Sequence, residues 1–229
     1  MALSLAHIEG VATHRLIASR YPTVGPFDYM GDVETIEAAL ALEGATNDRL
    51  NDVAGRLALL APGDIAIGVP SAHQAMAPFL HPAEAGGRFN GPELGAWYAA
   101  LDIETAIAET RYHHHRRLAA SQAGFPSTIE MRELLSRPSA DLVDLRRLDD
   151  AALYHHEDYR AGQRFGRARR DERRDGIWYR SVRRREGENV VLFKPRLLVP
   201  VIQGDHYRYD WDAQGAFSAT RLTPLGEVL

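Results

Sequence analysis

The chain has 229 residues, of which 45% are hydrophobic and 25% are charged, a balance typical of folded globular proteins rather than disordered or fibrous ones. Its formal net charge of -4 argues against a general nucleic-acid-binding protein, because such proteins usually carry an excess of basic residues. The lack of cysteine excludes disulfides, a thiol nucleophile and a cysteine-based zinc site.

Short elements and breaks alternate in the first third of the chain. Residues 14–18 (HRLIA) are predicted to form a strand, and the segment 21–31 that follows contains proline and glycine and cannot be regular helix throughout. Strong helix formers and candidate caps predict three helices before residue 81. The predicted helices cover residues 33–42, a stretch from a cap at Asn47 to Leu60, and residues 71–80.

A strand, tight turn and helix follow one another in the middle of the chain. Residues 96–101 (AWYAAL) form a short apolar strand, and Asp102 is a good N-cap for the helix that follows. Apolar residues recur at helical spacing from Ile103 to Thr110, which predicts a buried stripe on a helix reaching about Leu118.

Strands dominate the remaining sequence, apart from one polar and charged stretch over 151–174 that is predicted to be helical. The predicted strands are 127–135, 141–145, 176–182, 189–193, 197–202 and 207–211. Short helices and many strands without regular βαβ order predict an α+β fold. We expect a single domain over 1–229, with residues 33–80 as an extra helical region.

Membrane insertion is not expected from this sequence. No uninterrupted apolar run approaches the roughly 20 residues of a membrane-spanning helix, and the N-terminus lacks the basic and apolar pattern of a secretory signal. We therefore expect a soluble, unprocessed protein, and a cytoplasmic location is compatible with the lack of cysteine.

The first candidate site lies in the loop Gly86-Gly87-Arg88-Phe89-Asn90. Two glycines beside an arginine allow both the backbone and the guanidinium of Arg88 to approach a phosphate closely. Such a tripeptide is by itself more often a plain turn, so the loop needs support from other motifs.

Two further candidates lie in the strand and helix unit. Tyr98 is in the AWYAAL strand, and Glu109 shares a flank of the helix with Thr105 and Tyr112 at the border of the apolar stripe. A carboxylate at such a border usually faces solvent. A functional role requires that Glu109 face a cleft beside Arg88.

The last candidate, Ser181, ends a glycine-started strand that runs into three arginines (DGIWYRSVRRR). A serine in this place is commonly a turn or capping residue. No G-x-S-x-G motif surrounds it, so we do not interpret Ser181 as a hydrolase nucleophile.

Together, GGRFN, AWYAALDIETAIAETRYH and DGIWYRSVRRREGENVVLF strongly resemble the RES domain, a family named after arginine, glutamate and serine positions. The three motifs occur in the family's order within a motif core over 86–195. The segment His14-Arg15-Leu16 is similar to the arginine-bearing opening strand of the family.

The resemblance implies a toxin that consumes NAD and has a fold like that of ADP-ribosyltransferases. It places Arg15, Arg88, Tyr98, Glu109 and Ser181 around the NAD cleft, with Glu109, Arg88 and Ser181 as the catalytic set. Two arginines could bind the pyrophosphate, and Tyr98 offers an aromatic face. Glu109 could stabilise the charge that develops as nicotinamide leaves, and Ser181 could orient the carboxamide or a ribose.

The resemblance also implies a partner and leaves the acceptor of ADP-ribose open. The expected partner is an antitoxin that blocks the NAD cleft, and the acceptor is phosphate or water, or alternatively a target protein in a mono-ADP-ribosyltransferase. The chain differs from the family's common pattern in having Phe89 where tryptophan is usual, and in its longer region 33–80, which could be a lid, a partner surface or a specificity element.

Two other interpretations compete with this one. The runs His113-His114-His115 and His155-His156 suggest a metal-dependent hydrolase, but consecutive histidines on a helix point in different directions, so we expect no metal site. The arginine-rich stretch 160–185 suggests a nucleic-acid patch, but interleaved acidic residues would neutralise many of its charges locally.

Overall fold

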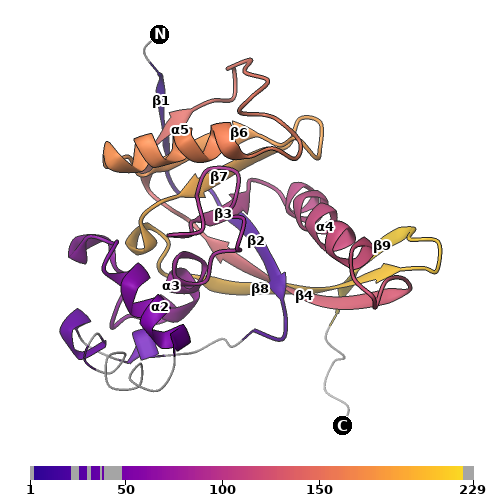
Figure 1. Cartoon of the computed structure of the whole chain (residues 1–229), viewed down its shortest axis with the longest axis horizontal. Coiled ribbons are helices and arrows are strands. Elements are labelled where there is room, and N and C mark those ends of the chain that lie inside the picture. Colours follow the sequence, from indigo (N-terminus) through magenta and orange to yellow (C-terminus); the bar gives the residue numbers. More distant parts are fainter. Residues whose placement is uncertain (1–2, 22–25, 30–31, 37, 39–47, 224–229) are drawn as a thin grey trace.

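The computed structural model describes residues 3–21, 26–29, 32–36, 38 and 48–223 (Figure 1). Its strands form one nine-stranded sheet in the order β1-β5-β6-β7-β3-β2-β4-β8-β9, in which only β5 and β6 pair in parallel. The strands are β1 Leu5–Ile8, β2 Thr13–Ala18, β3 Trp97–Ala100, β4 Ser127–Ser136, β5 Ala140–Asp144, β6 Gly176–Arg180, β7 Glu188–Leu192, β8 Ile202–Trp211 and β9 Phe217–Leu222. The predicted α+β class is confirmed.

Helices pack around this sheet in separate groups (Figure 1). The α-helices are α2 Asp48–Leu57, α3 Ala72–Leu80, α4 Ile103–Ala119 and α5 Arg160–Asp171, and short 3₁₀ turns lie at Pro26–Asp28, Pro62–Asp64 and Pro195–Leu197. Figure 1 shows α4 along the sheet near β9, α5 near β6, and α2 with α3 at the other end. None of the helices in the described part of the chain is long and apolar enough to cross a membrane.

Strand β3 and Ala96, the residue before it, contribute to all three hydrophobic clusters of the core. Trp97 and Ala99 pack with α2 and α3, Ala100 packs with α4 and β8, and Ala96 packs with Phe89 and the β5 and β6 strands. The three clusters therefore meet around β3.

The strand, turn and helix predicted around Asp102 are confirmed. Its carboxylate accepts hydrogen bonds from the backbone N–H and the hydroxyl of Thr105, both at 2.8 Å, which satisfies a donor at the start of α4. The predicted strands at 14–18, 127–135, 141–145, 176–182, 189–193 and 207–211 and the helix at 71–80 are also present.

Two predicted elements were wrong. The helix predicted over 151–174 is confined to α5, and residues 151–159 form turns in which Asp150 and His155 accept hydrogen bonds from nearby backbone amides. The strand predicted over 197–202 is absent, because Pro195 begins a 3₁₀ turn and Pro200 has no N–H to donate to a sheet.

Other elements were not predicted or cannot be compared. The edge strands β1 and β9 were missed. Residues 33–36 and 38 are helical, whereas the rest of the helix predicted over 33–42 and the cap predicted at Asn47 lie outside the described residues.

Candidate active site

A cavity of about 440 Å³ lies where β2, β3, α4 and the loop 86–90 meet. Arg15, Arg88, Tyr98 and Glu109 line it, together with Pro78 at the end of α3. Four of the five residues predicted for the site therefore face one cavity, and the fifth, Ser181, contacts Glu109 by a hydrogen bond.

The carboxylate of Glu109 is held by one of its two oxygens. Oε1 accepts a hydrogen bond from the Ser181 hydroxyl at 2.7 Å and another from Nδ2 of Asn189 at 2.9 Å. Oε2 accepts none from the described residues. This arrangement fixes the side chain and leaves one oxygen available to a ligand.

The hydroxyl of Ser181 is fully engaged at the turn that follows β6. It accepts hydrogen bonds from the amides of Arg183 and Arg184 at 3.0 and 3.1 Å, and its single proton goes to Glu109. The turn therefore holds Ser181, and Ser181 holds Glu109. A direct contact between Ser181 and a ligand stays a prediction.

Arg88 is buried, with 7% of its surface exposed. Its Nη1 donates to the carbonyl oxygens of Leu153 and His155 at 2.9 and 2.8 Å, and its guanidinium lies 4.7 Å from the centre of the Tyr159 ring. Because Arg88 takes these two carbonyls, the backbone before α5 is drawn away from helical geometry. Arg88 thus supports the site as well as lining it.

Tyr98 fixes the loop that carries Arg88. Its hydroxyl accepts a hydrogen bond from the Phe89 amide and donates one to Oδ1 of Asn90, each at 2.8 Å. Burial raises the pKa of Tyr98, so the hydroxyl keeps its proton. A side chain at Gly87 would collide with both Asn90 and this hydroxyl, which explains the glycine there.

Helix α5 supports the same loop from outside. Gly162 and Gly166 of α5 lie so close to the backbone carbonyls of Arg88 and Phe89 that a Cβ at either glycine would clash. Gln163 between them donates to the carbonyl of Ala85 at 2.8 Å. We call this contact between Gly162, Gly166 and residues 88–89 the glycine seam.

Arg15 enters the cavity from β2. Its Nη1 donates to the backbone carbonyl of Tyr98 at 3.0 Å, and its guanidinium lies 5.1 Å from the centre of the Trp97 ring. Burial lowers the pKa of Arg15 to about 10, so the side chain is a cation at neutral pH. The cavity thus holds two arginines and one carboxylate.

Three residues of the site were not predicted from the sequence. Asn189 is buried and anchors Glu109, Tyr179 is buried beside it, and His113 lines the cavity one helical turn after Glu109. Burial raises the pKa of Tyr179 and lowers that of His113, and the charge of Glu109 raises both. Two signals were available in the sequence, the asparagine at the start of the apolar strand ENVVL and the i, i+4 spacing of Glu109 and His113.

The histidines diverge, as predicted from their spacing. His113 faces the cavity, His114 bonds to Arg117, and His115 packs against Phe125. Over the described residues, no three histidine, aspartate or glutamate side chains gather as metal ligands would. The three consecutive histidines therefore have three different surroundings.

Several charges in the arginine-rich stretch are neutralised by ion pairs, some with near and some with distant carboxylates. The ion pairs are Arg160 with Asp158, Arg169 and Arg174 with Glu172, Arg167 with Glu93, Arg173 with Asp64 and Arg184 with Asp102. Arg170 instead donates to the Gly95 carbonyl and lies over the Phe193 ring. Of the interleaved acidic residues, Glu172 neutralises Arg169 and Arg174 as predicted, whereas Asp175 pairs with Lys194 and other arginines use carboxylates outside the stretch.

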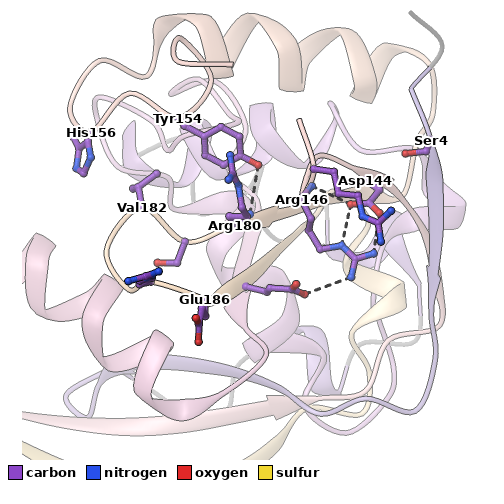
Figure 2. A pocket seen from close by; sticks show the side chains of 13 residues that line it. Ser4, Asp144, Arg146, Tyr154, His156, Arg180, Val182 and Glu186 are labelled. Carbon is purple, nitrogen blue, oxygen red and sulfur yellow. Dashed lines mark hydrogen bonds and ion pairs between the residues drawn. The ribbon is translucent and has the colours of Figure 1, made fainter. Parts of the chain in front are cut away.

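A second hollow of about 920 Å³ includes Ser181 and extends over the ends of β5 and β6 (Figure 2). Arg146 bonds to Asp144 and also pairs with Glu188, while Arg180 lies over the ring of Tyr154. The turn at Ser181 is therefore exposed to this hollow while it holds Glu109 in the cavity.

Comparisons with known proteins identify relatives of this chain. The RES domain family model matches residues 65–212. The uncharacterized protein y4oC of Sinorhizobium fredii (strain NBRC 101917 / NGR234) is 30% identical over 203 residues, which are 87% of this chain and 82% of the relative. The crystal structure of the M. tuberculosis MbcT-MbcA toxin-antitoxin complex includes a chain that is 12% identical, with a TM-score of 0.47, covering 90% of this chain and 87% of that one.

Proposed function

The chain belongs to the RES domain family, and from this premise we propose that it is a toxin of a toxin-antitoxin module that cleaves the nicotinamide-ribose bond of NAD. One observation carries the proposal above all. Glu109 faces the cavity with one oxygen anchored by Ser181 and Asn189 and the other available. A carboxylate so fixed suits the stabilisation of a positive charge that forms only in the transition state.

The two arginines suit the pyrophosphate of NAD. Arg15 stays cationic, and it lies with Arg88 on the wall that also carries Tyr98. Nη1 of Arg88 holds the chain before α5, so the proposed phosphate contacts use its other nitrogens. The face of the Tyr98 ring would contact the nicotinamide or its ribose, since the hydroxyl is held by the loop.

The chemistry of the proposed reaction is a displacement at C1′ of the nicotinamide ribose. The bond from C1′ to the ring nitrogen breaks, and nicotinamide leaves as a neutral molecule with the electron pair. Positive charge then develops on the ribose, and the free oxygen of Glu109 stabilises it, as carboxylates do in glycoside cleavage. Phosphate or water takes the ADP-ribose; the alternative is a protein side chain in a mono-ADP-ribosyltransferase.

The proposed partner is an antitoxin that covers this cavity, and the proposed location is the cytoplasm. We also propose that the chain is one domain in which α3, the last helix of the extra region, shields the cavity. Pro78 and His81, at the end of α3, lie in the cavity wall, and α3 is packed into the core through Met76 and Phe79. Pro78 of α3 therefore joins the extra region to the wall of the site.

Incubation of the purified, antitoxin-free protein with NAD tests the function. Released nicotinamide is measured, and mass spectrometry follows ADP-ribose with and without phosphate and with cell lysate. We expect nicotinamide release that a metal chelator leaves unchanged. No release under any of these conditions would contradict the proposal, and activity lost to the chelator and restored by zinc would favour the histidine-based alternative.

Replacement of Ser181 by alanine is expected to lower kcat about tenfold and to leave KM nearly unchanged, because Glu109 loses one of two anchors. The same change should have almost no effect in a protein that already carries Glu109→Gln, since Ser181 acts through Glu109. Ser218→Ala on the exposed face of β9 is the control. An equal loss of kcat on Ser181→Ala in the parent protein and in Glu109→Gln would show that Ser181 acts on the ligand itself.

A further inference from the structure

A histidine and a glutamate form a pair beside the cavity that the proposed function does not use. Nδ1 of His14 lies 2.5 Å from Oε1 of Glu133. The side chain of Glu133 is 6% exposed, whereas that of His14 is 23% exposed and lines the cavity. Nε2 of His14 makes no hydrogen bond to the described residues.

The sheet brings His14 to the face that carries the anchor of Glu109. His14 is paired with Ala100, Ala100 with Asn189, and Asn189 with Tyr179, in successive strands. Residues directly opposite one another in antiparallel strands point to the same face, so these four form one row. Two strand spacings, about 10 Å, separate His14 from Asn189, and only alanine lies between them.

The fold makes a specific place for the carboxylate of Glu133. The pairing of β4 with β8 shifts register between Arg132 and Leu134, which places Glu133 at a bulge. Oε2 accepts a hydrogen bond from the Asp205 amide at 3.0 Å, and a side chain at Gly204 would collide with this carboxylate. With Oε2 held by the backbone, Oε1 is aimed at Nδ1 of His14.

This geometry determines which nitrogen of His14 is available. A buried carboxylate accepts the proton on Nδ1, which leaves the lone pair of Nε2 directed away from Glu133. A carboxylate in this place also stabilises the imidazolium that forms when Nε2 takes a proton, as in the hydrolase triads. The pair thus has the parts of a general base that opens onto the cavity.

We propose that His14 is the general base that takes a proton from the water molecule that captures ADP-ribose, with Glu133 as its positioning residue. This inference rests on the proposed NAD cleavage. The oxygen of water bonds to C1′ as the bond from C1′ to the nicotinamide nitrogen breaks, nicotinamide leaves neutral with the electron pair, and the proton of water passes to Nε2 of His14. ADP-ribose is the product.

Other charged and titratable groups surround the pair and bear on any pH dependence. They are Tyr207 and Asp205 of β8, Arg221 of β9, which pairs with Asp205, Arg15 of β2, and Glu104, Glu109 and His113 of α4. Because all of them remain in a variant changed only at His14, a difference between the pH profiles of variant and parent belongs to His14.

The test compares His14→Asn, Glu133→Gln and the parent protein. Asparagine keeps a donor near the position of Nδ1 for Glu133 but has no group at Nε2. The variant therefore keeps the hydrogen bond to Glu133 and loses only the proposed base. His7→Asn is the matched control, because His7 also bonds a carboxylate, that of Asp141 at 2.8 Å, but on the exposed edge strand β1. ADP-ribose formation is measured against pH, with azide as a second acceptor that carries no proton to remove.

We expect His14→Asn to lower the rate of hydrolysis about 100-fold with KM unchanged, and Glu133→Gln to lower it less. The dependence of the hydrolysis rate on pH should differ between His14→Asn and the parent protein, because only the parent carries a base at this position. Formation of ADP-ribosyl azide should continue at the parent rate, because azide needs no base.

Unchanged hydrolysis in His14→Asn, or an equal loss of the water and azide reactions, would overturn the proposal. These outcomes differ from a failure of the proposed function. If the parent protein releases no nicotinamide, both proposals fall. If the parent cleaves NAD and His14→Asn hydrolyses it at the same rate, only the proposal that His14 is the general base falls.

Discussion

Replacement of Glu109 by glutamine is expected to lower nicotinamide release by two to three orders of magnitude while the protein stays folded. The amide oxygen of glutamine can accept the hydrogen bonds from Ser181 and Asn189 that Oε1 accepts in the parent protein. The negative charge is lost, however, and removal of one well-placed electrostatic group in an active site typically costs about 100- to 1,000-fold in rate.

The measurement is the single-turnover rate of nicotinamide release, with circular dichroism to show that the fold is intact. Glu104→Gln is a matched control, because Glu104 lies on the same helix but is exposed to solvent. A rate for Glu109→Gln within a few-fold of the parent would remove Glu109 from the mechanism, whatever else cleaves NAD.

Replacement of Gly166 by alanine is expected to destabilise the protein by about 3 kcal/mol, because the new Cβ would overlap the carbonyl of Phe89. Both partners in this contact are backbone atoms, so neither can move without displacing α5 or the loop 86–90. The midpoint of thermal unfolding should therefore fall by roughly 6–12 °C for a chain of this size.

Gly55→Ala in α2 is the same chemical change, but its expected effect on stability has the opposite sign. Gly55 lies inside a helix, and no atom of the described residues outside that helix's own backbone is within 4 Å of the position its Cβ would take. Alanine there should stabilise the protein by about 0.5–1 kcal/mol. Thermal unfolding measures both variants. Equal changes in the unfolding midpoint would contradict the close backbone contact at the glycine seam.

Local signals predicted those parts of the site that depend on neighbours in sequence. Asp102 caps the helix that carries Glu109, and Ser181 lies at the turn that ends β6. The placement of these residues around one cavity came from the resemblance to the RES family, and the structure brings Arg15, Arg88, Tyr98 and Glu109 together there. Their catalytic and binding roles stay predictions.

The remaining features depend on contacts between distant parts of the chain. Asn189 reaches Glu109, and His14 reaches Glu133, only through the pairing order of the sheet, which no local pattern reveals. Residues 151–159 have a helix-like composition, but Arg88 takes the carbonyl oxygens of Leu153 and His155 from more than 60 positions away. Tertiary contacts here outweigh intrinsic helix propensity.

The glycine seam has a consequence for the motions of the protein. Because the loop 86–90 rests on α5 through backbone atoms, and Gln163 of α5 bonds to Ala85, the loop and the helix should move as one body. The amide of Phe89 would then exchange its hydrogen with solvent only during openings that also expose amides of α5. Widening of the cavity on this side therefore requires displacement of a whole helix, which confines such openings to rare, cooperative events.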